Sequence, residues 1–189
     1  PQLLMLSGIG PKPELDKHGV KTRVNLPGVG TNLQDRYEVG VVSRLKAPWS
    51  VLKDATFTRA DPQFKQWSRW RKGVYTTNGA ALAVINRSKH GGPQPTKIEP
   101  PLPDLFMFAV LGEFHGYFPG YSKLIAERLD RLTWAILKAH TLNHGGTVKL
   151  RSKDPLDTPL INFRYFQEGT DKNGLDLESV VDGVEFVRL

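Results

Sequence analysis

The stretch that most constrains the fold is residues 105–111, LFMFAVL, an uninterrupted apolar run between Asp104 and Gly112. A run this short is typical of a strand covered on both faces, since most helices need ten residues or more. The residues before it, 89–103, hold five prolines and two glycines, which predicts a surface connection. We therefore expect residues 105–111 to form a central strand of a sheet.

Other strands are indicated by stretches rich in Val, Ile, Tyr and Thr, namely residues 36–46, 79–88, 132–142 and 145–153. We expect the second of these to be buried, because it is almost wholly apolar. The last two are separated by a short loop containing Gly145 and Gly146, a length that predicts a hairpin. Residues 154–166 contain two prolines, which cannot donate to a strand ladder, so we expect an extended excursion there.

Helices are indicated at residues 3–6, 12–19, 61–72 and 177–187. The third begins with Asp61 and Pro62, a favourable N-cap and first-turn pair. Its Phe64, Trp67 and Trp70 recur at helical spacing and predict a core stripe. Together these elements indicate an α+β fold, with an antiparallel sheet of four or five strands and helices against one face.

Composition excludes several classes of protein. The chain has 189 residues with 39% hydrophobic and 24% charged content, which is ordinary for a globular domain. It holds no run of eighteen apolar residues, so no transmembrane segment is expected. Zero cysteines exclude disulfides and thiolate metal sites within these residues. Both ends of the sequence read as the middle of an element, which suggests a segment of a longer polypeptide.

The net charge of +7 is concentrated in residues 41–75, which contain eight Lys or Arg and only two Asp. Tryptophans alternate with these basic residues along the sequence. Basic residues mixed with aromatic ones are one way to bind nucleic acid. The alternative is a solvated helix surface whose aromatic side chains pack inward. We favour the second interpretation and expect no nucleic-acid partner.

The glycine pair in SGIGP, residues 7–11, is compatible at first sight with a nucleotide loop. A dinucleotide fingerprint needs a strand before the glycines and a third glycine after them. Here the preceding residues are strong helix formers, and Pro11 and Pro13 follow the pair. Gly8 therefore predicts a helix C-terminus and not a phosphate-binding turn.

No catalytic motif is visible from spacing alone. The five histidines are too far apart for a metal site, and neither a serine-nucleophile motif nor a P-loop occurs. We expect no metal site. His140 and His144 are expected to be structural or exposed.

Several blocks together resemble the GMC (glucose–methanol–choline) family of FAD-dependent alcohol oxidoreductases. PQLLMLSGIGP at 1–11 is similar to the family's S-P-x-x-L-x-x-S-G-I-G-P, and LPGVGTNLQD at 26–35 resembles its G-V-G-x-N-L-x-D-H. GGTVKLRSKDPLDTPLIN at 145–162 resembles a third block, and TTNGAALAVIN at 76–86 resembles a segment lying between them. The blocks occur in the family's order and span most of the chain.

The resemblance implies that residues 1–36 end an FAD-binding domain and that residues 37–189 belong to the substrate-binding domain. It also implies FAD as the cofactor of the full-length protein and a small-molecule alcohol as substrate. The family's phosphate-binding loop would precede this chain and its catalytic histidine would follow Leu189. We therefore expect no catalytic residue here, and an inactive chain when it is isolated.

For the cofactor, the resemblance points to Asn32 and Leu33, in a turn expected to pack beside the flavin. A purely structural reading is that Asn32 and Asp35 cap the turn through their side chains. The sequence departs from the family at Arg36, where His is usual, and at Ala81 or a neighbouring residue, where an acidic residue is usual. Both departures weaken the transfer of roles to those positions.

For the substrate, we expect Glu113, His115 and Phe118 to line the pocket, because they combine aromatic surface with titratable groups in a loop after an apolar strand. The alternative is a surface loop with its aromatic side chains folded beneath it.

Two functions follow from the resemblance. The chain is part of an enzyme that oxidises a primary or secondary alcohol by hydride transfer to flavin, or it is a non-catalytic binding or scaffold domain that retained the same fold.

Overall fold

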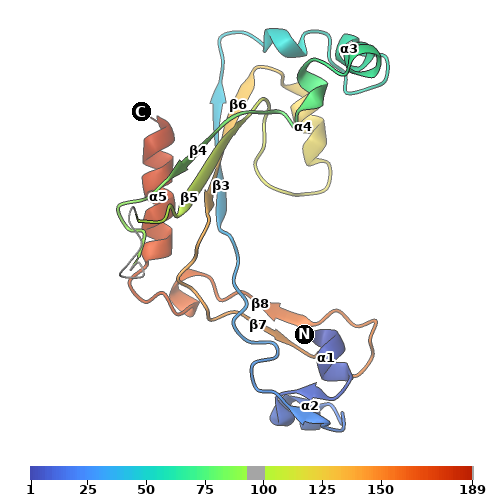
Figure 1. Ribbon diagram of the computed structural model, residues 1–189, viewed down its shortest axis with the longest axis vertical. Coiled ribbons are helices and arrows are strands. Elements are labelled where there is room, and N and C mark those ends of the chain that lie inside the picture. The colour runs from blue at the N-terminus through green and yellow to red at the C-terminus, as the bar shows by residue number, and fades with distance from the viewer. Residues whose placement is uncertain (93–100, 189) are drawn as a thin grey trace. The chain divides into compact units, whose positions relative to one another are not determined.

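The structure is a computed structural model that describes residues 1–92 and 101–188 (Figure 1). The chain forms two compact units. Unit 1 consists of Pro1–Arg36 and His140–Glu178, and unit 2 consists of Tyr37–Ala139 and Ser179–Leu189. The first boundary coincides with the one expected after residue 36, but residues 140–178 cluster with the N-terminal segment. The assignment of either unit to FAD or substrate binding stays a prediction.

Unit 2 is built on a four-stranded antiparallel sheet in the order β3-β6-β5-β4. Its strands are β3 (Glu38–Arg44), β4 (Ala80–Asn86), β5 (Leu105–Val110) and β6 (Arg131–Lys138). The expected central strand is confirmed, since β5 pairs with β4 on one side and with β6 on the other. The α+β class with an antiparallel sheet is confirmed as well.

The core of unit 2 lies between the sheet and helix α5 (Leu175–Arg188). Leu105, Met107 and Ile136 are fully or almost fully buried, and Val184 and Val187 of α5 pack against them. Alternate residues of β5 are buried, as the pleat requires when a strand packs one face on a helix. The apolar stripe of the last helix thus meets the apolar run that dominates the sequence.

Strand β4 departs from its expected burial. Most of its side chains are exposed, and Leu82 and Ile85 keep 50% and 68% of their surface accessible. The reason is its place at the edge of the sheet, where, among residues 1–92 and 101–188, β5 is the one strand that pairs with it. Apolar composition identified the strand, but the number of neighbours decided its burial.

The rest of unit 2 consists of short helices, which are η1 (Ser50–Leu52), α3 (Pro62–Trp70), η2 (Val74–Thr76) and α4 (Tyr121–Glu127). Helix α3 begins at the expected Pro62 and ends before Arg71, which has the left-handed backbone of a C-cap. The predicted core stripe is wrong at Trp70, which is 61% exposed, while Phe64 and Trp67 are half-buried. Arg69 lies over the Trp70 ring at 4.9 Å, although most of the Trp70 side chain stays accessible to solvent.

Unit 1 contains α1 (Gln2–Leu6), β1 (Ile9–Gly10), α2 (Lys12–Lys17), β2 (Val24–Asn25), β7 (Thr147–Lys149), β8 (Leu160–Asn162) and η3 (Phe166–Glu168). Its core is formed by Met5, Leu15 and Leu150. Gly8 follows α1 with a φ of +84°, and its carbonyl accepts hydrogen bonds from Arg23 and Val24. SGIGP is therefore a helix end joined to β2, as expected from its residues.

The expected hairpin between residues 132–142 and 145–153 is wrong. β6 pairs with β3 and β5 in unit 2, whereas β7 pairs with β8 in unit 1. The prolines of 154–166 indeed exclude a central strand, but they leave room for the three residues of β8. The loop length alone predicted a local hairpin, but β6 forms its hydrogen bonds with strands that are distant in the sequence.

Candidate functional site

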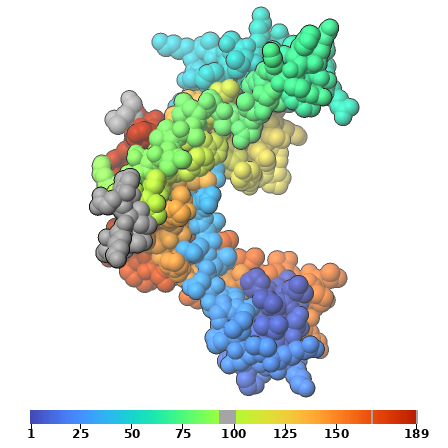
Figure 2. Space-filling view, viewed as in Figure 1, coloured from blue at the N-terminus to red at the C-terminus, as the bar shows by residue number. Residues whose placement is uncertain are grey.

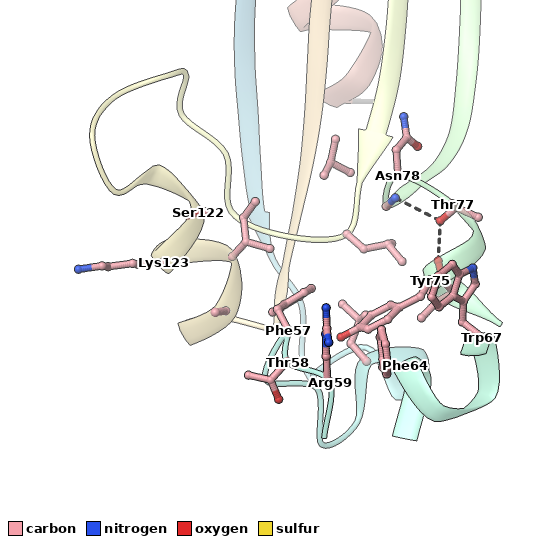
Figure 3. Close-up of a pocket in the computed structure, with 17 residues that line it drawn as sticks. Phe57, Thr58, Arg59, Phe64, Trp67, Tyr75, Thr77, Asn78, Ser122 and Lys123 are labelled. Carbon is pink, nitrogen blue, oxygen red and sulfur yellow. Dashed lines mark hydrogen bonds between the residues drawn. The ribbon is translucent and has the colours of Figure 1, made fainter. Parts of the chain in front are cut away.

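A cavity of about 830 Å³ lies within unit 2 (Figure 3), a size typical of small-molecule sites. It is lined by Leu52, Phe57, Thr58, Arg59, Phe64, Trp67, Val74, Tyr75, Thr77, Asn78, Gly79, Val110, Leu111, Ser122, Lys123, Ile125 and Ala126. Apolar and aromatic side chains form most of this lining. Several hydroxyl and amide groups and two cationic side chains supply the polar contacts.

Two segments distant in sequence enclose the cavity. Residues 52–79 supply one side through α3, η2 and the loops beside them, and α4 supplies the other. Figures 1 and 2 show both segments at the same end of unit 2, the first in teal to green and the second in yellow. The ends of β4 and β5 close the space between them, with Gly79 and Val110 in the lining.

The loop before α3 is held by the carboxylate of Asp61, which is 2% exposed. Its oxygens accept hydrogen bonds from the backbone N–H and hydroxyl of Thr56, the backbone N–H of Thr58 and the Tyr75 hydroxyl at 2.5 Å. Asp61 occupies the expected N-cap position but makes no side-chain cap of α3. Its carboxylate instead joins the loop 56–61 to Tyr75, which lines the cavity.

These hydrogen bonds change the acidity of both partners. Burial alone would raise the pKa of Asp61, but the donors from Thr56, Tyr75 and Thr58 stabilise the carboxylate and lower its pKa overall. Burial and the hydrogen bond to Asp61 raise the pKa of Tyr75 to about 12. At neutral pH Asp61 is a charged acceptor and Tyr75 is a neutral donor. Their hydrogen bond fixes the Tyr75 hydroxyl and leaves the faces of the ring available for packing.

The charged side chains that line the cavity are both cationic. Arg59 and Lys123 contribute cationic groups, and the described residues that line it include no Asp or Glu. Figure 3 shows the Arg59 side chain beside Phe57 and Tyr75, whereas the Lys123 ammonium points away from them. Of the two cationic side chains in the lining, Arg59 is therefore the one that lies beside the aromatic rings.

A second cluster surrounds Glu113, whose side chain is buried. Its carboxylate accepts hydrogen bonds from Arg128 at 2.8 Å and is paired with His115 Nε2 at 2.9 Å and with Arg131 Nε at 3.3 Å. The hydrogen bonds from His115 and Arg128 lower the pKa of Glu113. A carboxylate so fully paired ties the loop 113–118 to β6 and to the end of α4.

The structure therefore brings together two of the three residues expected at the substrate. Glu113 and His115 are in contact, while Phe118 is 43% exposed and packs edge-on against Tyr121. None of the three belongs to the lining of the cavity. Their role in substrate binding stays a prediction.

The residues expected at the cofactor lie in a turn of unit 1. Asn32 has a φ of +55° and an exposed side chain, and Leu33 is half-buried with its N–H donated to the Gly146 carbonyl. Gly30 has a φ of +83°, and a Cβ there would lie 2.2 Å from the Val148 carbonyl oxygen. The turn therefore packs backbone to backbone, which leaves the Asn32 amide directed outward.

The contact of this turn with FAD stays a prediction, and its exposed groups are compatible with it. An exposed amide beside an apolar side chain suits the edge of a ring that combines polar atoms with hydrocarbon. The expected capping by Asp35 is present, because its carboxylate accepts the Arg36 N–H and the Tyr165 hydroxyl. The described parts of the chain show no hydrogen bond from the Asn32 side chain, so a ligand could take that amide.

Sequence reasoning missed most of the cavity. Phe57, Arg59 and Tyr75 lie in residues 41–75, which were singled out only for their charge and aromatic content, and Ile125 lies in a segment for which no role was predicted. The available signal was the basic and aromatic composition of residues 41–75 directly before TTNGAALAVIN. That signal could not reveal α4, because its contact with this segment is made only in the tertiary structure.

Comparisons with known proteins place the chain in a family. No protein-family model matches it. An oxygen-dependent choline dehydrogenase of Staphylococcus aureus is 33% identical over 179 residues, which cover 91% of this chain and 28% of that protein. A variant of the formate oxidase of Aspergillus oryzae RIB40 superimposes with a TM-score of 0.73 at 26% identity, over 100% of this chain and 34% of the other.

A fungal aryl-alcohol oxidase shares the fold, with a TM-score of 0.64 at 20% identity. The chain thus spans about a third or less of the proteins that it matches. Among the described residues, no helix is both long and apolar enough to cross a membrane. The sequence blocks, the choline dehydrogenase homology and the formate oxidase superposition agree, and the chain is a segment of the GMC family of FAD-dependent oxidoreductases.

Proposed function

We propose that the full-length protein is an FAD-dependent enzyme that oxidises a primary or secondary alcohol by hydride transfer to flavin. The observation that carries the proposal is the homology to choline dehydrogenase, supported by the superposition on formate oxidase. Bound FAD would supply the two-electron acceptor for the alcohol. The chain's own contribution is to hold and orient the two reactants.

Unit 2 forms the substrate-binding part in this proposal, with the cavity as the pocket. Its aromatic lining offers apolar surface for the body of a substrate, and Asn78, Thr58 and Ser122 offer polar groups at its wall. A mostly apolar cavity with a few polar groups is the usual form of a small-molecule site. Such a wall excludes water and fixes the orientation of the alcohol.

The turn at residues 30–33 holds FAD in this proposal, through the Asn32 amide and the Leu33 side chain. The packing of Gly30 against Val148 supports this role, because it presents Asn32 outward on a fixed backbone. We assign residues 1–36 to the FAD-binding domain because their sequence blocks resemble those at the end of that domain in the family. Glu113, His115 and Phe118 are proposed to complete the substrate site of the whole enzyme, with Glu113 holding the loop through its arginine partners.

The test uses the full-length protein, purified and mixed anaerobically with a panel of alcohols while the flavin absorbance is followed. The expected result is a stoichiometric flavin whose absorbance is bleached by at least one alcohol. A protein that retains flavin but is reduced by none of a broad panel would favour the binding or scaffold function instead.

Blocking the cavity tests its role in that reaction. Ser122 lines the cavity and is exposed, so Ser122→Trp should obstruct it with little cost to folding. Ser68 is exposed on α3 and does not line the cavity, so Ser68→Trp is the matched control. We expect Ser122→Trp to raise KM for the preferred alcohol and Ser68→Trp to leave it unchanged. Equal KM values in both variants would place the substrate elsewhere.

A further inference from the structure

The charge around the cavity is unbalanced. The side chain of Arg59 is exposed and lies beside the aromatic lining. Within residues 1–92 and 101–188 the arginine ion pairs are those of Arg44, Arg128 and Arg131, so Arg59 has no carboxylate in ion-pair distance. The acidic side chain nearest in sequence, Asp61, is buried and already accepts hydrogen bonds from Thr56, Thr58 and Tyr75. The cavity therefore presents a cation with no counter-ion of its own.

The aromatic rings around this cation give the shape of a complementary ligand. Phe57 and Tyr75 are stacked with ring centroids 6.2 Å apart, and both line the cavity beside Arg59. The lining also includes Phe64, Val74 and Ile125. A ligand that fills this space needs an apolar body, since few polar groups face it.

A cationic ligand is disfavoured by a second observation. Aromatic rings can bind a quaternary ammonium group through their faces. The Trp67 ring of the lining, however, already has a cation over it, since Arg71, which does not line the cavity, lies 4.9 Å from its centroid. A second cation would meet repulsion from both Arg71 and Arg59, and no carboxylate of the lining would offset it.

We propose that this cavity binds an apolar molecule that carries a carboxylate, with Arg59 as the partner of that carboxylate. The preference of the cavity for a carboxylate is independent of the proposed function. Only the statement that the bound molecule is the substrate alcohol rests on that function. A planar guanidinium can donate two parallel hydrogen bonds to a carboxylate, which gives orientation as well as affinity. The apolar body then lies along Phe57 and Tyr75, away from the charged end.

Binding is tested directly by calorimetry on the full-length protein with three ligands that share a 4-methylphenyl body, differ in the charge of the attached group and lack a hydroxyl group. These are 4-methylbenzoate, neutral 4-methylbenzamide and cationic 4-methylbenzyltrimethylammonium. We expect the benzoate to bind about tenfold or more tightly than the other two, the factor typical of one charge-assisted hydrogen-bonded pair. Equal or tighter binding of the amide or the ammonium compound would overturn the proposal.

Two variants assign the preference to Arg59. Arg59→Met should weaken 4-methylbenzoate binding about tenfold and leave 4-methylbenzamide binding nearly unchanged. Lys65→Met removes an exposed cation of α3 that does not line the cavity, and should change neither affinity. Circular dichroism spectra establish that both variants are folded. Unchanged benzoate affinity in folded Arg59→Met would refute the role of Arg59.

The reaction provides a separate readout. Under the proposed function, 4-(hydroxymethyl)benzoate should reduce the flavin with a lower KM than 4-(hydroxymethyl)benzamide, and Arg59→Met should abolish that difference. Tight, Arg59-dependent binding of 4-methylbenzoate without flavin reduction by any alcohol would support the ligand class and contradict the oxidoreductase function. Flavin reduction that favours neutral or cationic alcohols would support the function and contradict the ligand class.

Discussion

Lys138 and Asp104 form an ion pair in the interior of unit 2, with Lys138 Nζ 2.5 Å from Asp104 Oδ2 and both side chains almost fully buried. The same ammonium donates to Ser179 Oγ of α5 at 3.2 Å. Ser88 adds its backbone N–H and hydroxyl to the Asp104 carboxylate. The pair thus fastens α5 to the sheet and to the loop after β4 through a fully hydrogen-bonded network.

Removing the lysine should leave a buried carboxylate unpaired. Lys138→Met is expected to cost about 3–5 kcal/mol of stability, the usual range when one partner of a buried pair is lost. Thermal and urea unfolding of the full-length protein measure the change, and Lys123→Met on an exposed residue is the control. A loss of less than about 1 kcal/mol would show that solvent reaches Asp104.

The turn beside the proposed cofactor contact depends on Gly30. Gly30→Ala places a Cβ 2.2 Å from the Val148 carbonyl oxygen. It also puts an alanine into a left-handed backbone with a φ of +83°, which is strained for any residue with a side chain. The backbone strain alone costs about 1–2 kcal/mol, and the clash adds to it. Gly28→Ala is the control, since no atom lies within 4 Å of its Cβ. Unfolding curves should separate the two variants, and equal stability would mean that the turn can open without cost.

Acid should weaken the loop that Asp61 holds. The folded-state pKa of this carboxyl is lowered by its donors, so its contribution to stability is present above the unfolded pKa of about 3.9 and is lost as pH falls through the folded value. Asp61→Asn should therefore lower Tm at pH 7, and its difference from the wild type should shrink steadily below pH 4. The measurement is Tm against pH for both proteins. A difference that stays constant into strong acid would exclude the carboxylate as its source.

Phe118 tests the proposed substrate role of the loop 113–118. Because Phe118 is 43% exposed, Phe118→Ala should change Tm little, whereas loss of a positioning contact can reduce kcat/KM by up to about a hundredfold. Tyr117→Ala, at a residue that is 80% exposed in the same loop, is the control. Steady-state kinetics of the full-length enzyme give the answer. A melted protein with normal kinetic constants in its folded fraction would make the loop structural.

Local sequence determined the elements whose cause is local. The helix formers before Gly8, the Asp61–Pro62 pair and the apolar run at 105–110 each produced the predicted element, since capping, backbone freedom and apolar runs act within a few residues. The family's sequence blocks likewise identified the chain as a GMC segment before any fold was known. These signals need no knowledge of distant partners.

Only the tertiary structure decided which elements meet. β7 pairs with β8 and not with β6, as the expected hairpin would require. β4 is an exposed edge strand, because in the described part of the chain it pairs with β5 alone. The cavity arises in the same way, since β4 and β5 lie between residues 52–79 and α4 in the sequence. Strand pairing and cavity shape depend on long-range contacts whose free energy no short stretch encodes. Sequence therefore specified the parts and the family, and packing alone brought Arg59 to an aromatic wall without a counter-ion.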